Sequence, residues 1–124
     1  MNNIKFIVVI APDELQINGS LQNEVIEAFY SNLNKEKWNI TLPNQMLTSK
    51  LDQLGIKYID LYPIFREKSP EPLYRPRDTH WNIAGNQLAA AIIEQHMLSY
   101  VKELKTTYRS QSAVQDLGGN KAAP

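Results

Sequence analysis

The chain opens on an apolar segment of the kind that forms a strand buried on both faces. Residues 4–10 are β-branched or aromatic apart from Lys5, and they show no alternation between apolar and polar positions. A continuous apolar run of this length predicts an interior strand of a parallel sheet, which Pro12 ends. The run is too short for a signal-peptide core or a membrane span.

Two amphipathic helices are predicted after this strand. The first follows the candidate N-cap Ser20 and closes near Lys35. The second has Pro43 in its first turn and stops at Gly55. Apolar residues recur at helical spacing in both segments: Leu21, Val25, Phe29 and Leu33 in the first, and Leu47, Leu51 and Leu54 in the second.

A second strand, a long loop and a last helix complete the pattern. Residues 56–64 predict the strand. The loop Arg66–Asp78 contains three prolines, so we do not expect it to be helical. The last helix is expected from Asn82 to about Leu104. Residues 106–124 are mostly polar and predict a disordered tail.

Two parallel strands joined by a helical crossover predict an α/β unit. Two strands do not make a stable sheet by themselves. We therefore expect the unit either to belong to a larger fold, with a missing N-terminal half, or to complete its sheet by self-association.

Composition removes several classes of function. The 13 Lys and Arg residues balance the 13 Asp and Glu residues, and no basic stripe is visible, so binding to nucleic acid or an anionic membrane has no electrostatic support. The chain has no cysteine, which excludes disulfides, thiolate nucleophiles and cysteine-ligated metals.

The densest chemical signal lies where the loop meets the last helix. There Asp78 precedes His80 by two residues. A histidine that acts as a general base needs an acceptor on its second ring nitrogen, and an aspartate in the same loop can supply one. From spacing alone the alternative remains open that Asp78 is a turn residue and His80 a surface residue.

The context of this pair resembles a known family. The block Asp78-Thr79-His80-Trp81-Asn82, with Gly85 after it, resembles the last active-site block of the SGNH (GDSL-type) hydrolase superfamily. Residues 8–18 resemble the strand and turn that follow its oxyanion block, and residues 54–61 its final strand. The Asp-x-His spacing is closer to the alginate O-acetyltransferase-like branch than to esterases with Asp-x-x-His.

The resemblance implies a fold and a reaction. Residues 1–105 would form the C-terminal part of a three-layer flavodoxin-like α/β fold with a parallel sheet. His80 would be the general base of a serine esterase or O-acyltransferase, oriented by Asp78, with an acylated carbohydrate or another ester as substrate and no cofactor. A periplasmic or cell-envelope location is implied by the family alone.

The family's serine block and its oxyanion-hole residues are expected upstream of this chain. Gly-x-Ser-x-Gly does not occur here, and four of the internal serines have simpler roles. Ser20 is a cap, Ser31 and Ser49 lie in predicted helices, and Ser69 lies in the proline-rich loop.

Three neighbouring residues are candidates for substrate binding, each with an ordinary alternative. Trp81 is suited to stacking on a sugar or to packing beside the helix. Arg75 and Arg77 are suited to an anionic sugar or to solvated loop charges. A metal site formed by Asp78, His80 and either Glu94 or His96 is disfavoured.

Two alternatives come from other classes of function. A carbohydrate-binding or assembly module of the same fold, without catalysis, remains the main alternative. A small flavodoxin-like regulatory domain is disfavoured, because the chain has no phosphate-binding glycine loop.

The first prediction is that the purified 124-residue chain is catalytically silent toward acetyl esters. General-base catalysis by His80 needs a hydroxyl to activate, and the sequence offers no suitable serine. Release of nitrophenol from nitrophenyl acetate measures this. Hydrolysis above background that disappears in His80→Ala would overturn the prediction.

Overall fold

The structure is a computed structural model that describes residues 5–32, 38–69 and 71–118. Its elements along the chain are β1 (Val8–Ile10), α1 (Glu14–Ile17), α2 (Gly19–Phe29), α3 (Leu42–Gln53), β2 (Tyr58–Asp60), α4 (Tyr62–Glu67), β3 (Tyr74–Arg75), β4 (Asp78–Trp81) and α5 (Ile83–Gly118).

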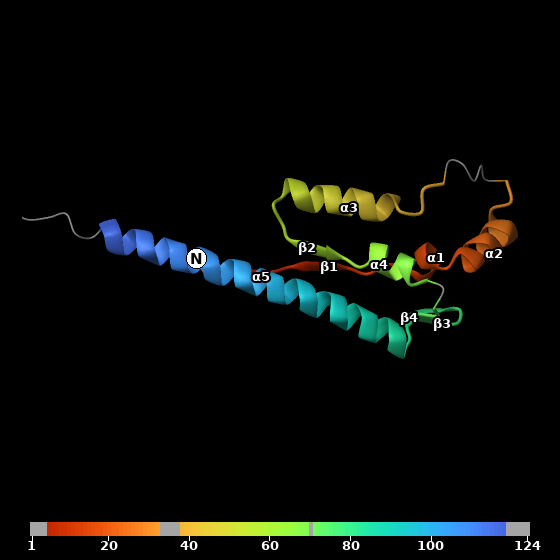
Figure 1. The fold of residues 1–124 in the computed structure, drawn as a ribbon. Helices are drawn as coiled ribbons and strands as arrows, with labels where there is room; N and C mark the ends of the chain where they lie inside the picture. Colours follow the sequence, from red (N-terminus) through yellow and green to blue (C-terminus); the bar gives the residue numbers. More distant parts are fainter. Residues whose placement is uncertain (1–4, 33–37, 70, 119–124) are drawn as a thin grey trace, which may run out of the picture.

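The strands β1 and β2 form a parallel sheet in which Val8 lies opposite Tyr58 and Ile10 opposite Asp60. Figure 1 shows α3 on one side of this sheet and α5 on the other, so the unit has three layers. The predicted α/β fold with a parallel sheet is thereby confirmed. A second, antiparallel sheet consists of β3 and β4.

The core lies between the sheet, α4 and the first turns of α5. Its most deeply buried side chains are Phe65, Ile59 and Leu61. The ring of Phe65 packs against Tyr74 and Trp81, with ring centroids 6.3 Å and 5.3 Å apart. The hairpin β3–β4 is therefore anchored on the hydrophobic core through these aromatic contacts.

The predicted strand over residues 56–64 is wrong beyond Asp60. There the chain turns into α4, which carries Pro63 in its first turn. Proline fits that position because the first N–H groups of a helix have no partner within the helix. The Asp60 Oδ1 accepts the N–H of Tyr62 at 3.0 Å and so closes the strand. The loop predicted from Arg66 likewise starts inside α4.

The first helical region also differs from its prediction. Asp13 begins the short helix α1 with a capping box to Gln16, a signal that was readable in the sequence. A new helix, α2, follows with Asn18, not Ser20, as its cap. It ends at Phe29, and the predicted positions Leu33 and Lys35 lie outside the described residues, as does Ile4 of the first strand.

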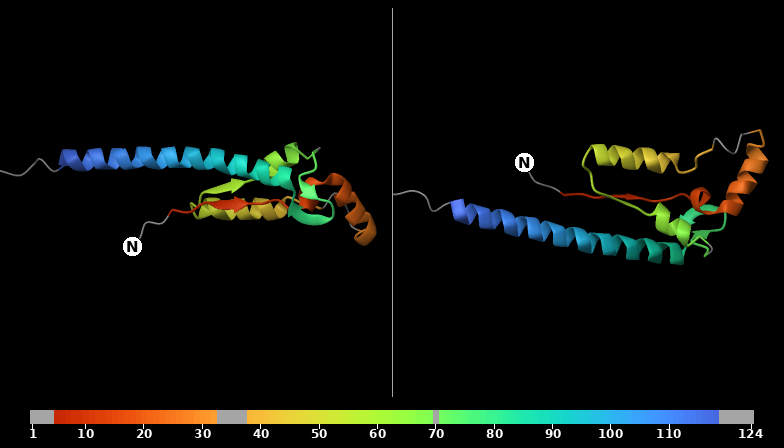
Figure 2. Two further views of the ribbon diagram at one scale, coloured as in Figure 1. Left: turned by 90° about the horizontal axis from the view of Figure 1, so that it is seen from below. Right: turned by 45° about the horizontal axis from the view of Figure 1, so that its top comes forward.

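The last helix is longer than its pattern predicts. It runs past Leu104 to Gly118, so residues 106–118, predicted as part of a disordered tail, continue it. Residues 86–117 contain neither glycine nor proline, so no strong helix breaker interrupts them. Figure 2 shows this part of α5 projecting past the sheet. In the described ranges no helix is long and apolar enough to cross a membrane.

The second prediction concerns Gly85, where the chain passes close to another segment. A Cβ at this position would overlap the carbonyl oxygen of Leu73 and lie 3.1 Å from the Trp81 Cβ. Gly85→Ala should therefore lower the free energy of unfolding by about 1–3 kcal/mol, as forced overpacking does. Urea denaturation measures the change.

Gly19→Ala is the matched control, because a Cβ there meets nothing within 4 Å. It should leave stability unchanged or raise it slightly. Equal effects of the two substitutions would contradict the predicted clash at Gly85.

Candidate active site

The hairpin β3–β4 presents Asp78 and His80 on one face. Successive residues of a strand point to opposite sides, so residues two apart share a side. The tight turn before β4 is formed by Pro76 and Arg77, and Arg77 has a positive φ of 56°. Such a conformation is uncommon for a side chain other than glycine, asparagine or aspartate. Arg77 therefore shapes the turn that precedes the pair.

Asp78 and His80 are in direct contact. The Asp78 Oδ1 is hydrogen-bonded to the His80 Nδ1 and also accepts the backbone N–H of His80 at 3.3 Å. These two bonds, the ring bond first, hold the pKa of Asp78 below its usual value, and the charge of Arg75 lowers it further. The orientation leaves the Nε2 of His80 without a hydrogen bond to any described residue.

A cleft of about 430 Å³ opens beside His80. It is bounded by the carboxyl end of the strand β1, the hairpin and the first turn of α5. Ligands of open α/β sheets bind at this end of the strands. Side chains and backbone from three separate segments line it: Ala11, Pro12, Arg75, Thr79, His80, Trp81 and Asn86.

The pair is open to solvent in the described part of the chain. The side chain of His80 is 79% exposed and that of Asp78 is 42% exposed. In this setting the ion pair adds little to stability. Its geometry is chemically significant nevertheless, because it leaves Nε2 as the ring nitrogen available for proton transfer.

The three candidate substrate residues fall in different places. Trp81 is half-buried and reaches both Phe65 and the cleft, so it combines the packing role with a position at the site. Arg75 lines the cleft. Arg77 instead lies 3.4 Å from Glu24 of α2 in an exposed ion pair and does not line the cleft.

The four serines named in the sequence analysis do not line this cleft. Ser20, Ser31 and Ser49 are exposed on or beside α2 and α3, and Ser69 lines a different cavity together with Glu14 and Glu71. Thr79, which carries a hydroxyl, does line the cleft. However, its position in β4 directs it away from the face shared by Asp78 and His80.

The residues of the disfavoured metal site are not gathered. His96 bonds through its Nδ1 to the carbonyl of Ile92 at 2.8 Å, one turn earlier in α5. Among the described residues, no group of three or more histidine, aspartate or glutamate side chains could hold a metal ion.

Sequence reasoning missed Asn86 and the turn Ala11–Pro12 as parts of the site. Asn86 lies one helical turn after Asn82. With Asn82 as the N-cap of α5, Asn86 would be expected on the face of the helix that borders the cleft. Nothing in the local sequence of Ala11 and Pro12 indicates that they lie at the site. The turn reaches the hairpin because the Tyr74 hydroxyl donates to the Pro12 carbonyl at 2.6 Å, and burial raises the pKa of Tyr74 to about 12.

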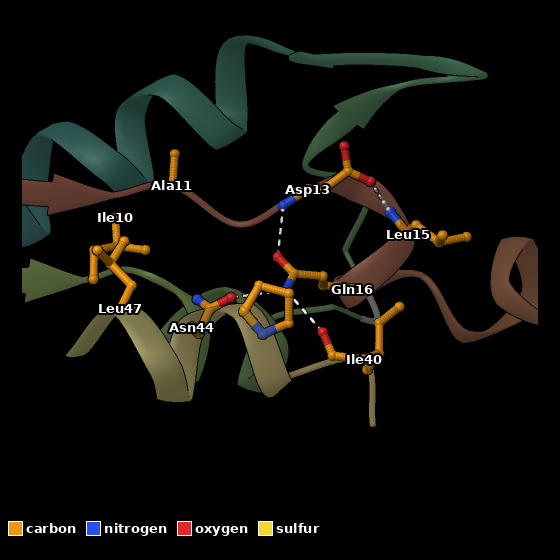
Figure 3. Close-up of a pocket in the computed structure, with 9 residues that line it drawn as sticks. Ile10, Ala11, Asp13, Leu15, Gln16, Ile40, Asn44 and Leu47 are labelled. Atoms are coloured by element: carbon orange, nitrogen blue, oxygen red, sulfur yellow. Dashed lines mark hydrogen bonds between the residues drawn. The ribbon is translucent and has the colours of Figure 1, made fainter. Parts of the chain in front are cut away.

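A second cavity, of about 460 Å³, lies on the other side of Ala11 (Figure 3). Its polar lining is already paired: the Gln16 Nε2 donates to the Asn44 Oδ1 at 2.8 Å and to the Ile40 carbonyl at 3.0 Å. The Asn44 Nδ2 donates in turn to Asp60. The carboxylate of Asp13 also lines the cavity and caps α1, where its Oδ1 accepts the Leu15 N–H at 2.8 Å. The other lining residues are apolar, and no histidine is among the described ones.

Comparison with known families gives one result. A family model described as SGNH hydrolase-like domain, acetyltransferase AlgX, matches residues 2–120. The matched range includes both strands of the parallel sheet and the whole Asp78–Asn82 block. Searches of curated proteins and of solved structures returned no match.

The third prediction is that Asp78 titrates below 3.8, the ordinary value, and that His80→Ala moves its pKa back toward that value. The lowered pKa means that the pair stabilises the fold above the ordinary value and loses this effect as pH falls through the pKa of the folded state. Consequently, the stability cost of Asp78→Asn should shrink in acid.

Carboxyl carbon chemical shifts followed against pH measure the Asp78 pKa directly. The control is His96→Gln, which removes the other histidine and should leave the titration of Asp78 unchanged. If the pKa of Asp78 lies in the ordinary range and does not change in His80→Ala, the hydrogen bond between the two side chains is contradicted.

Proposed function

The chain belongs to the family of the SGNH hydrolase-like domain of acetyltransferase AlgX, and from this premise we propose that it supplies the Asp78–His80 pair of a serine-dependent carbohydrate esterase or O-acetyltransferase. The observation that carries the proposal is the orientation of His80. Its Nδ1 is held by Asp78, while its Nε2, beside a cleft, has no hydrogen bond to a described residue.

The reaction assigns one role to each member of the pair. The Nε2 of His80 takes the proton of a serine hydroxyl as that oxygen bonds to the carbonyl carbon of the ester. The same proton then passes to the departing sugar oxygen as its bond to the acyl carbon breaks. Water or another sugar hydroxyl then gives its proton to His80 as its oxygen bonds to the acyl carbon. The bond from that carbon to the serine oxygen breaks, and His80 returns the proton to the serine. Asp78 stabilises the imidazolium at each stage.

The serine is proposed to come from a part of the domain outside this chain. Among the described residues no serine lines the cleft beside His80, and its hydroxyl-bearing residue, Thr79, lies on the opposite face of β4. The high exposure of His80 supports the same view. A general base and its nucleophile react best in a site that excludes water.

Arg75 and Trp81 are the proposed contacts to the substrate. Both residues line the cleft, and the Trp81 ring also packs against Phe65. A planar aromatic surface and a hydrogen-bonding cation suit a sugar with an acyl ester. Arg77 is left out of this role because it pairs with Glu24.

The sheet is proposed to continue at the free edge of β1. The Val8 N–H donates to the Lys57 carbonyl, and the Ile10 carbonyl accepts the N–H of Leu61. Alternate residues of a parallel strand bond to the same neighbour, so the backbone groups of Val9 point the other way. No described strand pairs there. Either the rest of the domain or a second copy of the chain is the expected neighbour.

The fourth prediction tests the whole proposal. The coding DNA is read in frame on both sides of this chain, and the longest product is assayed with nitrophenyl acetate and an acetylated oligosaccharide. His80→Ala and Asp78→Asn should each lower kcat by roughly 10³-fold or more, as loss of a triad member does. His96→Gln should retain activity.

Two outcomes would contradict esterase or transferase chemistry. One is an active product whose rate does not depend on His80. The other is an inactive product with no serine block in either direction that still binds the oligosaccharide. The latter result would support a carbohydrate-binding module, the alternative favoured by the lack of a serine in the cleft.

A further inference from the structure

Asn82 makes more contacts than a helix cap requires. Its Oδ1 accepts the N–H of Gly85 at 2.9 Å, which caps α5. Its backbone N–H donates to the Leu73 carbonyl at 3.0 Å, and its Nδ2 donates to the Pro72 carbonyl at 2.6 Å. The Tyr74 carbonyl lies 3.4 Å from the same Nδ2. One residue thus binds three consecutive carbonyls of the loop.

The strand pairing of the hairpin that carries Asp78 and His80 does little by itself to set its register. Its strand β3 has only two residues, and its pairing with β4 is irregular between Tyr74 and Arg75. A pair of such short strands is not stable by itself. The hydrogen bonds that Asn82 makes at the end of β4 therefore act together with the packing of Tyr74 and Trp81 on Phe65 to fix β4 against the loop.

We propose that Asn82 is a positioning residue for His80. Its hydrogen bonds form a clamp that holds the backbone carbonyls of residues 72–74 against the end of β4. The inference deepens the proposed function and rests on it for its catalytic meaning. The clamp itself concerns only contacts within this chain.

The alternative role, helix capping alone, does not account for the amide group. Serine or aspartate caps a helix as well as asparagine does. Neither offers the amide N–H groups that reach Pro72 and Tyr74. Asn18, the cap of α2, shows the contrast: its Oδ1 accepts the Leu21 N–H at 3.1 Å, while its Nδ2 has only a 3.5 Å contact with Glu14. Asn18 is therefore a natural control for capping without clamping.

The fifth prediction uses the tautomer of His80 as its readout. With His96→Gln in every variant, His80 is the only histidine, and long-range proton–nitrogen correlation spectra at alkaline pH report which ring nitrogen carries the proton. In the parent the bond to Asp78 should favour the Nδ1–H tautomer. Asn82→Ser should lower the ratio of Nδ1–H to Nε2–H by roughly tenfold, the equivalent of one modest hydrogen bond.

Two comparisons separate clamping from capping and from loss of the fold. Asn18→Ser should leave the tautomer ratio unchanged. Asn82→Asp keeps the shape and the cap acceptor but removes the amide donors, so it should keep the helical circular dichroism of the parent while shifting the tautomer. If Asn82→Ser denatures the chain, Asn82→Asp still decides the question.

An unchanged tautomer ratio in folded Asn82→Asp would overturn the positioning role. An equal shift in Asn18→Ser would also overturn it, because the effect would then follow from any weakened cap. Since no substrate is present, either result stands independently of the esterase assay that tests the proposed function.

Discussion

The close approach of the Leu73 carbonyl to the start of α5 is the constraint on which the rest of the structure depends. It requires a residue without a Cβ at position 85 and a donor at position 82. It brings the loop against the helix, so that Phe65 meets Tyr74 on one segment and Trp81 on the other. A helix N-terminus, a hairpin and a hydrophobic core thus meet at one place.

The candidate active site follows from this arrangement. A hairpin as short as β3–β4 would not hold the Asp78 and His80 side chains in register without external support. Its support comes from the core on one side and from the turn after β1 on the other, where Tyr74 bonds to Pro12. The cleft beside His80 is therefore formed by segments distant in sequence, although the pair itself spans three residues.

The differences between expectation and structure share a physical origin. Pro63 fits both at the end of a strand and in the first turn of a helix, and the N–H of Tyr62, which donates to the Asp60 Oδ1, marks where the strand gives way to the helix. The side chain of Ser20 is suited to capping a helix, but the Asn18 Oδ1 accepts the Leu21 N–H, so Asn18 is the cap. At the other end of the chain, polarity suggested a tail, while the lack of glycine and proline allowed the helix to continue to Gly118.

The sequence by itself determined the α/β pattern, the parallel strands and the contact of Asp78 with His80, because apolar periodicity and a spacing of two residues are local properties. Tertiary structure decided which residues surround that pair. It brought Asn86 and Pro12 to the cleft, turned Arg77 toward Glu24 and bound Asn82 to the loop. These contacts join segments that come together only after the loop has folded back onto α5, and no local pattern encodes that return.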